Sequence, residues 1–391
     1  MITLREYNSF TNLDHIKEEW DKLVLECNST IYMTYDWCKT WWDIYRNKKE
    51  LLIFHFYDDE KLIGILPIYF EKIFFGPVSL TVCRLVGSNI PPKVFDPPIS
   101  ATHKIQALEH LLKIISNKCD IVSIGPVSEN YISDEDQKKL NDKSLFGHCS
   151  KEFYDNYMFI KLPDNFNKYL ESISSREKSA YKKNIKRLNR DFKLDVDIIK
   201  SFDEMAFKTF QGMHYNQWIK KGMLGHFKSW PFSTDFHLAL AQKQAEFTRY
   251  LLIKISKNQE AIFIGYGYIF NNTFYFQLFA RSVSPEDEKY SIGTIGHCII
   301  AEYLINNKGK MIELGPGLFD YKINLGAKSE KAWIYKFIAN RKSSLFKHKI
   351  VILEKRFVNI IYHKFWYRRV QPLLPAFLKQ PLSKHWIKLD F

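Results

Sequence analysis

The stretch YSIGTIGHCIIAEYLINNKGKMIELGPGLFDYK, residues 290–322, carries most of the information about how this chain folds. An apolar run with helical spacing begins among small residues, which are Ser291, Gly293, Thr294 and Gly296. A short strand is expected next, and a glycine loop follows it. Around that loop gather the polar residues Glu313, Asp320, Tyr321 and Lys322. The stretch therefore predicts a helix, a strand and a loop that delivers a polar cluster.

The small residues at the helix start are suited to holding an anion. The first backbone N–H groups of a helix have no intrahelical partner, and the helix dipole is positive there. Glycines at 293 and 296 let a phosphate approach the backbone closely. The alternative is an ordinary helix start, since Gly, Ser and Thr are common at such positions. We expect the phosphate of a cofactor to bind at this helix start, on Ser291, Gly293, Thr294 and Gly296.

The polar cluster after the strand contains the groups that acyl transfer needs. A base has to take a proton from the nucleophile, and Glu313 or Asp320 is a candidate. Tyr321 is a candidate for protonating a leaving thiolate, and Lys322 adjoins it. The alternative is structural, with the tyrosine packed under the loop and the lysine bonding carbonyl groups. Together with a phosphate seat, the cluster suggests a transferase that uses a phosphorylated carrier such as acyl-coenzyme A.

A second base candidate lies upstream in the segment MHYNQWIKKG. His214 and Trp218 are four residues apart, which places them on one face of a helix. We expect His214 to be catalytic and Trp218, with Gly317 of the glycine loop, to contact substrate. Cys298 lies inside the predicted helix without an activating base, so it is read as a small core residue.

The composition is that of a globular protein with two domains. The chain has 391 residues, of which 46% are hydrophobic and 16% aromatic. Charged residues interrupt the first thirty positions, so no secretory signal is expected, and no apolar run approaches the ~20 residues of a membrane span. Six cysteines without CxxC spacing predict neither a zinc site nor a disulfide framework, and no metal is expected. A cytoplasmic location is the simplest expectation.

The positive charge is concentrated at the C-terminal end. Of the net +14, residues 341–391 supply twelve lysines and arginines against Glu354 and Asp390. Such a tail suggests an anionic partner, which is a membrane surface, nucleic acid or a phosphorylated lipid carrier. The alternative is a solvated basic face.

A faint internal repeat recurs at an offset of 200 residues. LLIFHFYDDEKLIGILPIYF at 51–70 aligns with LLIKISKNQEAIFIGYGYIF at 251–270, with five identities. Each segment reads as strand, polar turn and strand. The repeat predicts two similar α/β domains, spanning 1–155 and 156–345, and a basic amphipathic helical tail over 346–391.

The predicted elements follow the same pattern in both domains. In the first domain helices are expected near 12–27, 36–46 and 103–117, and a strand at 119–125. In the second, a strand at 157–162 leads to a helix over 166–193 with Asp164 as its N-cap. That helix has seven cations within fifteen residues, among them Lys182 and Lys186. These cations repel one another, and a bound polyanion would offset the repulsion. Candidates for it are the 3′-phosphate of coenzyme A, a lipid pyrophosphate and tRNA. The alternative is a solvated face.

In order and motif, the chain resembles the GNAT-type acetyltransferases associated with cellulose and exopolysaccharide synthesis, which are related to the FemABX peptidyltransferases. The shared features are MHYNQWIKKG, YSIGTIG and a glycine at 317 followed by Tyr321-Lys322, with Glu313 in the acidic place. Ile292 stands where the family has proline, and Leu318 and Phe319 stand where it has acidic residues.

The resemblance implies two tandem GNAT-like domains with mixed sheets flanked by helices. It further implies an acyltransferase that moves an acyl group, acetyl above all, from acyl-CoA to an amino or hydroxyl group of a sugar or lipid-linked glycan. The tail would hold such an enzyme at the cytoplasmic membrane face. Two alternatives stay open: a FemABX-like ligase that uses aminoacyl-tRNA, and a non-catalytic GNAT-like scaffold.

Overall fold

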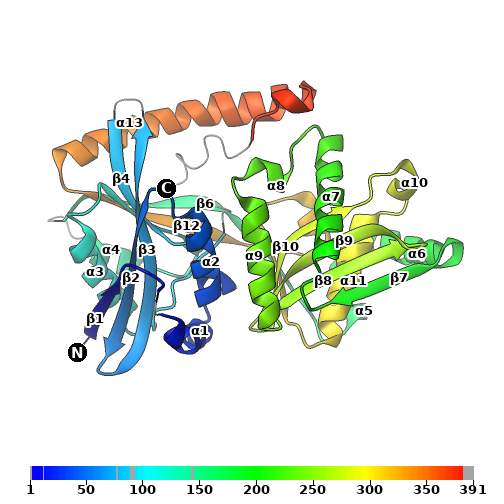
Figure 1. The fold of residues 1–391 in the computed structure, drawn as a ribbon, viewed down its shortest axis with the longest axis horizontal. Helices are drawn as coiled ribbons and strands as arrows, with labels where there is room; N and C mark the ends of the chain where they lie inside the picture. The colour runs from blue at the N-terminus through cyan, green and yellow to red at the C-terminus, as the bar shows by residue number, and fades with distance from the viewer. Residues whose placement is uncertain (1, 12, 76–77, 89–92, 142–144, 382–391) are drawn as a thin grey trace. The chain divides into compact units, whose positions relative to one another are not determined.

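The structure is a computed structural model that describes residues 2–11, 13–75, 78–88, 93–141 and 145–381. Two compact units make up this part of the chain (Figure 1). Unit 1 contains the residues up to Asp155 together with Lys331–Arg369, and unit 2 contains Asn156–Glu330 with Val370–Pro381. Each unit is a mixed sheet flanked by helices, as predicted.

The sheet of unit 1 is mixed, with antiparallel pairs on either side of one parallel pair. Its strands are β1 (Ile2–Tyr7), β2 (Lys49–Asp58), β3 (Lys61–Phe75), β4 (Val78–Leu85), β5 (Ile121–Ser128), β12 (Lys328–Ala339) and the first part of β6 (Phe146–Lys161). They lie in the order β1-β2-β3-β4-β5-β12-β6, with β4 and β5 parallel. The predicted hairpin over 51–70 is the β2–β3 pair.

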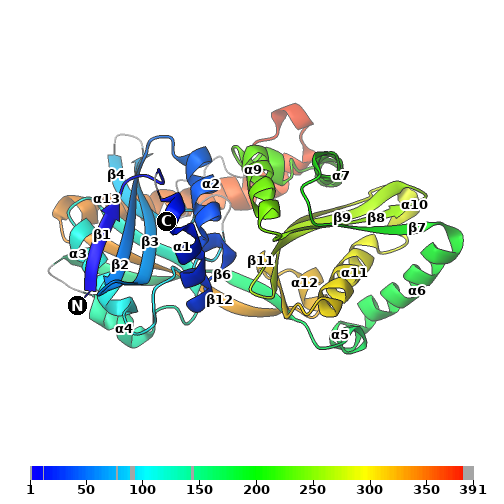
Figure 2. The ribbon, with the colours of Figure 1, turned by 60° about the horizontal axis from the view of Figure 1, so that its bottom comes forward.

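Five α-helices accompany this sheet. They are α1 (Lys17–Glu26), α2 (Tyr35–Tyr45), α3 (Lys104–Ile115), α4 (Asp134–Leu140) and α13 (Lys342–Val358). In Figure 2, α1 and α2 cover one face of the sheet, and α3 and α13 the other. Trp20, Trp37 and Trp41 are fully buried, so the aromatic positions of α1 and α2 form core.

Unit 2 repeats the arrangement. Its strands are the end of β6, β7 (Leu194–Ile199), β8 (Tyr250–Lys257), β9 (Glu260–Phe270), β10 (Thr273–Arg281) and β11 (Met311–Pro316). They lie in the order β6-β11-β10-β9-β8-β7, with β10 and β11 parallel. Asn258 and Gln259 at the β8–β9 turn have φ of 50° and 71°, the positive values that a tight hairpin turn demands.

The helices of unit 2 cover both faces of its sheet. They are α5 (Phe166–Ser172), α6 (Ser175–Asp191), α7 (Glu204–Lys220), α8 (His226–Ser229), α9 (Ser233–Glu246), α10 (Pro285–Glu288), α11 (Ile292–Asn306) and α12 (Asp320–Asn324). In Figure 2, α7 and α9 lie on one face, and α5, α6 and α11 on the other. Cys298 of α11 is fully buried in the hydrophobic core of this second layer, as expected for a core residue.

The two sheets share one topology, which supports the faint sequence repeat. The hairpin β2–β3 corresponds to β8–β9, the next strand β4 to β10, and the parallel strand β5 to β11. A helix connects the parallel strands in each case, α3 in unit 1 and α11 in unit 2. A further antiparallel strand pairs with the last strand of each set: β12 pairs with β5 in unit 1, and β6 pairs with β11 in unit 2.

These last strands are exchanged along the chain. β12 follows the elements of unit 2 in sequence but pairs with β5, whereas β6 precedes unit 2 and pairs with β11. Lys331–Arg369 therefore groups with unit 1, although the sequence boundaries of 155 and 345 assign part of it to the second domain. The predicted boundaries follow the two repeats along the sequence and stay a prediction. The compact units are defined by contacts, so β12 is counted mainly with unit 1 and the end of β6 with unit 2.

Several predicted helix limits differ from the structure. The single helix expected over 166–193 is wrong, because α5 and α6 are separated near Ser174, whose hydroxyl caps the backbone N–H of Glu177. The predicted cap Asp164 is also wrong, since the side chain of Asn165 accepts the N–H of Lys168 at 2.9 Å. The helical C-terminal region is confirmed: α13 starts at Lys342 and continues as η3 (Asn359–Val370), a π-helical segment.

Two short 3-10 helices precede α1 and α2, and two more follow η3. They are η1 (Asp14–Ile16), η2 (Ile31–Met33), η4 (Gln371–Leu373) and η5 (Ala376–Leu378). Residues 382–391 of the predicted tail lie outside the described part of the chain.

Candidate active site

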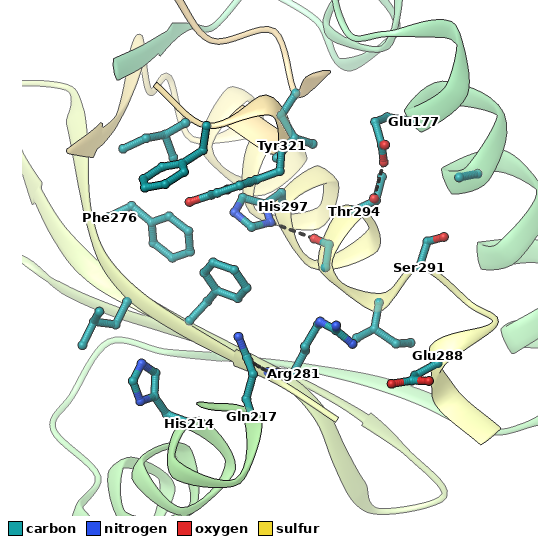
Figure 3. A pocket seen from close by; sticks show the side chains of 18 of the residues that line it. Glu177, His214, Gln217, Phe276, Arg281, Glu288, Ser291, Thr294, His297 and Tyr321 are labelled. Atoms are coloured by element: carbon teal, nitrogen blue, oxygen red, sulfur yellow. Dashed lines mark hydrogen bonds between the residues drawn. The ribbon is translucent and has the colours of Figure 1, made fainter. Parts of the chain in front are cut away.

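A cavity of about 800 Å³ opens in unit 2 where β10 and β11 part. The two strands pair only over Thr273–Tyr275 and Met311–Glu313, although β10 runs well beyond that point. Gln277 is the extra residue of a bulge, because the register against β9 shifts between Phe276 and Leu278. The far half of β10 thus borders the cavity instead of a parallel neighbour (Figure 3).

The walls of this cavity come from α6, α7, β10, the start of α11, the end of β11 and the segment 319–325. The labelled side chains in Figure 3 are Glu177, His214, Gln217, Phe276, Arg281, Glu288, Ser291, Thr294, His297 and Tyr321. All belong to unit 2.

The predicted small-residue start of α11 borders the cavity. Ser291 is the N-cap in a left-handed conformation with φ of 51°, and its side chain makes no capping hydrogen bond. A Cβ added at Gly293 would meet only the Cδ of Arg281, at 3.8 Å, so this backbone is open to a ligand. A Cβ at Gly296 would instead overlap the ring of Phe263. Glycine at 296 is therefore required by helix–sheet packing, and only the first turn is accessible.

Charged groups of both signs surround the helix start. The hydroxyl of Thr294 donates a short hydrogen bond to the carboxylate of Glu177. Three cations also line the cavity: Arg176, Lys221 and Arg281. Burial, and then the charge of Arg281, lower the pKa of Lys221. Glu288 is engaged by Lys220 of α7 at 2.7 Å, which leaves the cations in excess near the helix start.

His297 is the most distinctive polar group of the cavity, and it lies one helical turn after Gly293. Its Nδ1–H donates to the carbonyl of Gly293 at 2.7 Å, which leaves Nε2 as the acceptor nitrogen. Nε2 is buried and has no hydrogen-bond partner among the described residues. Burial is the main reason that the pKa of His297 is lowered to about 4, so the ring is neutral at physiological pH.

Aromatic rings enclose His297 on the cavity side. The ring centroids of Phe279, Phe276 and Tyr321 lie 5.0, 5.3 and 6.2 Å from its own. Although Tyr321 is 44% exposed as a residue, desolvation raises the pKa of its hydroxyl to about 12, so the hydroxyl keeps its proton. A neutral acceptor nitrogen and a protonated phenol thus border the same space (Figure 3).

His214 lies across the cavity on α7 and is engaged differently. The indole N–H of Trp218 donates to its Nε2 at 3.0 Å, as their helical spacing predicts. Burial lowers the pKa of His214 to about 4. Because its lone pair is occupied, His214 is less suited than His297 to accept a proton from a substrate.

The structure does not bring the whole predicted polar cluster to the cavity. Glu313 is buried within β11, and Asp320 is exposed at the start of α12. The ammonium of Lys322 is buried and donates to the carbonyls of Gly315 and Pro316 at 3.1 and 2.8 Å. That bonding matches the structural alternative for the lysine.

The remaining predicted residues also lie off the cavity lining. Gly317 has a φ of +97°, which favours glycine, and its N–H donates to the carbonyl of Asn156 at 2.9 Å. Lys182 and Lys186 are exposed on α6, beyond the cavity-lining Arg176 and Glu177. Their assignment to a cofactor stays a prediction.

Sequence reasoning missed His297, Gln277 and Arg281. The signal for His297 was present, since Gly293 and His297 are four residues apart and share one face of a helix. The carbonyl oxygen of the Gln277 side chain is buried without a hydrogen-bond partner in the described structure. No sequence pattern reveals a bulge at this position. No cluster of three or more potential metal ligands occurs within the described ranges.

The comparisons with known proteins agree with this geometry. A family model described as the acetyltransferase (GNAT) domain matches residues 175–323, which include α6, β10, α11 and every residue of the cavity lining except Leu325. No curated protein matches the chain.

Solved structures with a similar fold cover most of the chain. FemX has a TM-score of 0.62 at 11% identity and covers 86% of this chain and 98% of its own. A conserved protein of unknown function from Bacteroides thetaiotaomicron has a TM-score of 0.51 at 10% identity and covers 86% and 100%. L-PGS from Bacillus licheniformis has a TM-score of 0.51 at 10% identity and covers 85% and 95%.

The predicted likeness to GNAT and FemABX proteins is thus confirmed as a likeness of fold. The association with polysaccharide synthesis stays a prediction. The chain has a GNAT-type fold, and its residues 175–323 match the family model of the acetyltransferase (GNAT) domain.

Proposed function

We propose that unit 2 moves an acetyl or other acyl group from acyl-CoA to an amino or hydroxyl group of a sugar or lipid-linked glycan. The observation that carries this proposal is that a glycine-bearing helix start and the unpartnered Nε2 of His297 face one cavity. The glycan acceptor rests on the resemblance in the sequence, which further suggests a role in surface polysaccharide synthesis.

The donor in this proposal spans the cavity from the helix start to the aromatic wall. Its pyrophosphate is held by the first backbone N–H groups of α11 and by Arg281, which offset the nearby carboxylate of Glu177. Its amide-bearing arm runs along the part of β10 that has no parallel neighbour, where Gln277 presents a side-chain acceptor. The acyl carbon then lies near His297 and Tyr321.

The chemistry is direct attack without a covalent enzyme intermediate. The acceptor N or O forms a bond with the acyl carbon, and its proton passes to Nε2 of His297. The carbon–sulfur bond breaks, and the departing thiolate accepts a hydrogen bond from the hydroxyl of Tyr321. His214 and Trp218 contact the acceptor from α7, and Lys322 holds the loop. We assign Glu313 and Asp320 no proton transfer.

A thermal-shift panel tests the donor. We expect coenzyme A and acetyl-CoA to raise the melting temperature, and Arg281→Gln to reduce that rise. Lys208→Gln is the matched control, because Lys208 is exposed on α7 and outside the cavity lining. If no CoA species raises the melting temperature, acyl-CoA is not the donor.

An aminoacyl-tRNA donor is the second candidate. The exposed cations of α6, among them Lys182, Lys183 and Lys186, favour it because they form a basic strip beyond the cavity. A salt-sensitive rise with tRNA, and none with any CoA species, would establish this donor instead. If the chain is a non-catalytic scaffold, His297→Gln would leave the cellular phenotype unchanged.

A further inference from the structure

Helix α13 has two apolar faces, although a helix on the surface of a domain needs only one. Val351 is buried and packs with Leu345 against Ile73, Leu80 and neighbours of unit 1. A second set of large apolar side chains is exposed. Phe346, Leu353 and Phe357 have exposed fractions of 65%, 66% and 64%.

The exposed apolar residues form a straight row. Phe346 and Leu353 of α13 are spaced by seven residues, and Phe357 follows Leu353 one turn later. Seven residues make nearly two turns of an α-helix, so these side chains emerge on one side, away from the buried Val351. Exposed Ile360, Ile361 and Phe365 extend the apolar surface into η3. We name this surface, from Phe346 to Phe365, the apolar row.

A row of cations runs beside the apolar row. Lys342, Lys349 and Arg356 are exposed and also spaced by seven residues. Residues 341–370 contain nine lysines and arginines and a single acidic residue, Glu354. Large apolar side chains next to a row of cations complement an anionic lipid surface, whose headgroups are negative and whose acyl chains begin directly beneath.

We propose that α13 and the start of η3 dock on an anionic lipid bilayer, with the apolar row inserted at the headgroup boundary and the cation row on lipid phosphates. No described helix is long and apolar enough to cross a membrane, so this contact is peripheral. The proposal is independent of the acyl-transfer chemistry, because these residues belong to unit 1 and the cavity to unit 2.

Vesicle sedimentation with the full chain tests it. We expect binding to vesicles of phosphatidylcholine mixed with phosphatidylglycerol, weakened by salt, and no binding to phosphatidylcholine alone. Lys342→Gln with Lys349→Gln and Arg356→Gln should weaken binding by on the order of a hundredfold. Leu353→Ser with Phe357→Ser should weaken it at least tenfold.

Matched controls test whether binding depends on this surface or only on net charge and exposed apolar area. Lys113→Gln with Lys118→Gln and Lys138→Gln removes the same charge from exposed positions on and near α3 and α4. Leu25→Ser removes an apolar side chain that is 42% exposed on α1, which covers the other face of the sheet from α13. Both controls should bind the anionic vesicles as the unchanged chain does.

Three outcomes would overturn the proposal. One is the absence of binding to anionic vesicles by the unchanged chain. Another is binding that survives removal of the apolar row, because cations alone would then explain the adhesion. The third is a dimer in solution that Leu353→Ser with Phe357→Ser converts to a monomer without any vesicle binding, since a second copy would then cover the row.

Discussion

At the scale of single residues, the proposed chemistry of the cavity depends on His297. One of its ring nitrogens is hydrogen-bonded within the helix, and the other has no partner among the described residues. His297 donates through Nδ1 to a carbonyl of its own helix, so the tautomer and the ring orientation are fixed together. The surrounding rings keep it neutral, because a charged imidazolium would lose its hydration there. His214 lacks the open nitrogen, since Trp218 occupies it.

Replacing His297 with glutamine should lower the rate of acyl transfer by about 10²–10⁴-fold, the usual contribution of a general base. Donor binding should change little, because the side chain lies beyond the helix start. Steady-state kinetics, together with the thermal shift by coenzyme A, measures both effects. His110→Gln, at an exposed site on α3, serves as the control. A variant that keeps its full rate would remove His297 from the mechanism.

Cys298 offers a contrasting prediction on the same helix. It is fully buried, and burial raises its pKa to about 12, so little thiolate exists at neutral pH. Cys298→Ala should retain acyl transfer and lose about 1–2 kcal/mol of stability through the small cavity created. Activity assays and urea unfolding test the two parts. Loss of activity in a folded variant would mean that the thiol of Cys298 takes part in the reaction.

At the scale of elements, the first turn of α11 separates two glycines with different roles. Gly293 faces open space beside Arg281, whereas Gly296 lies against the ring of Phe263. Both belong to the motif that predicts an anion seat, yet packing explains one of them. The difference becomes visible only when the helix is placed on its sheet.

Alanine substitutions at the two positions should therefore diverge. Gly293→Ala should keep or raise stability by about 0.5–1 kcal/mol, since alanine favours the helix, while it weakens donor binding by obstructing the backbone. Gly296→Ala should destabilise the fold by about 1–3 kcal/mol because the added methyl overlaps Phe263. Thermal unfolding and calorimetric titration with coenzyme A distinguish the two. Equal loss of stability in both variants would contradict the assignment.

The elements that could be predicted were those with local signals. The hairpin turn at Asn258 and the helix after Ser291 follow from turn chemistry and periodicity. The division between α5 and α6 was missed because the cap Ser174 sits inside a run that reads as one helix. The bulge at Gln277 depends on pairing with β9, so no local pattern announces it. Burial of Lys322 is likewise a tertiary property.

At the scale of the whole molecule, both units contain buried histidines that make the folded state less stable in acid. His55 in unit 1 and His214 and His297 in unit 2 each have a pKa lowered to about 4, mainly by burial. In the unfolded chain these groups titrate near 6.5. Between these values the unfolded state binds more protons, so stability falls as the pH falls from about 6.5 towards 4.

Each of these histidines can contribute up to about 3 kcal/mol to that acid loss, in order of magnitude. Urea unfolding between neutral pH and about pH 5 should show the decline. His55→Phe should flatten it in unit 1, because the replacement cannot be protonated, and the exposed His110→Gln should not. An unchanged slope in His55→Phe would mean that other groups govern the acid response.

The exchange of β6 and β12 has a consequence for how the protein is made. A ribosome releases the hairpin, β4 and β5 of unit 1 long before it reaches Ala339, the last residue of β12. Until then the edge of β5 has no partner strand, so residues 1–155 alone cannot complete the sheet of unit 1. A chain that ends after residue 155 should therefore aggregate, because its sheet keeps an unpaired β5 edge.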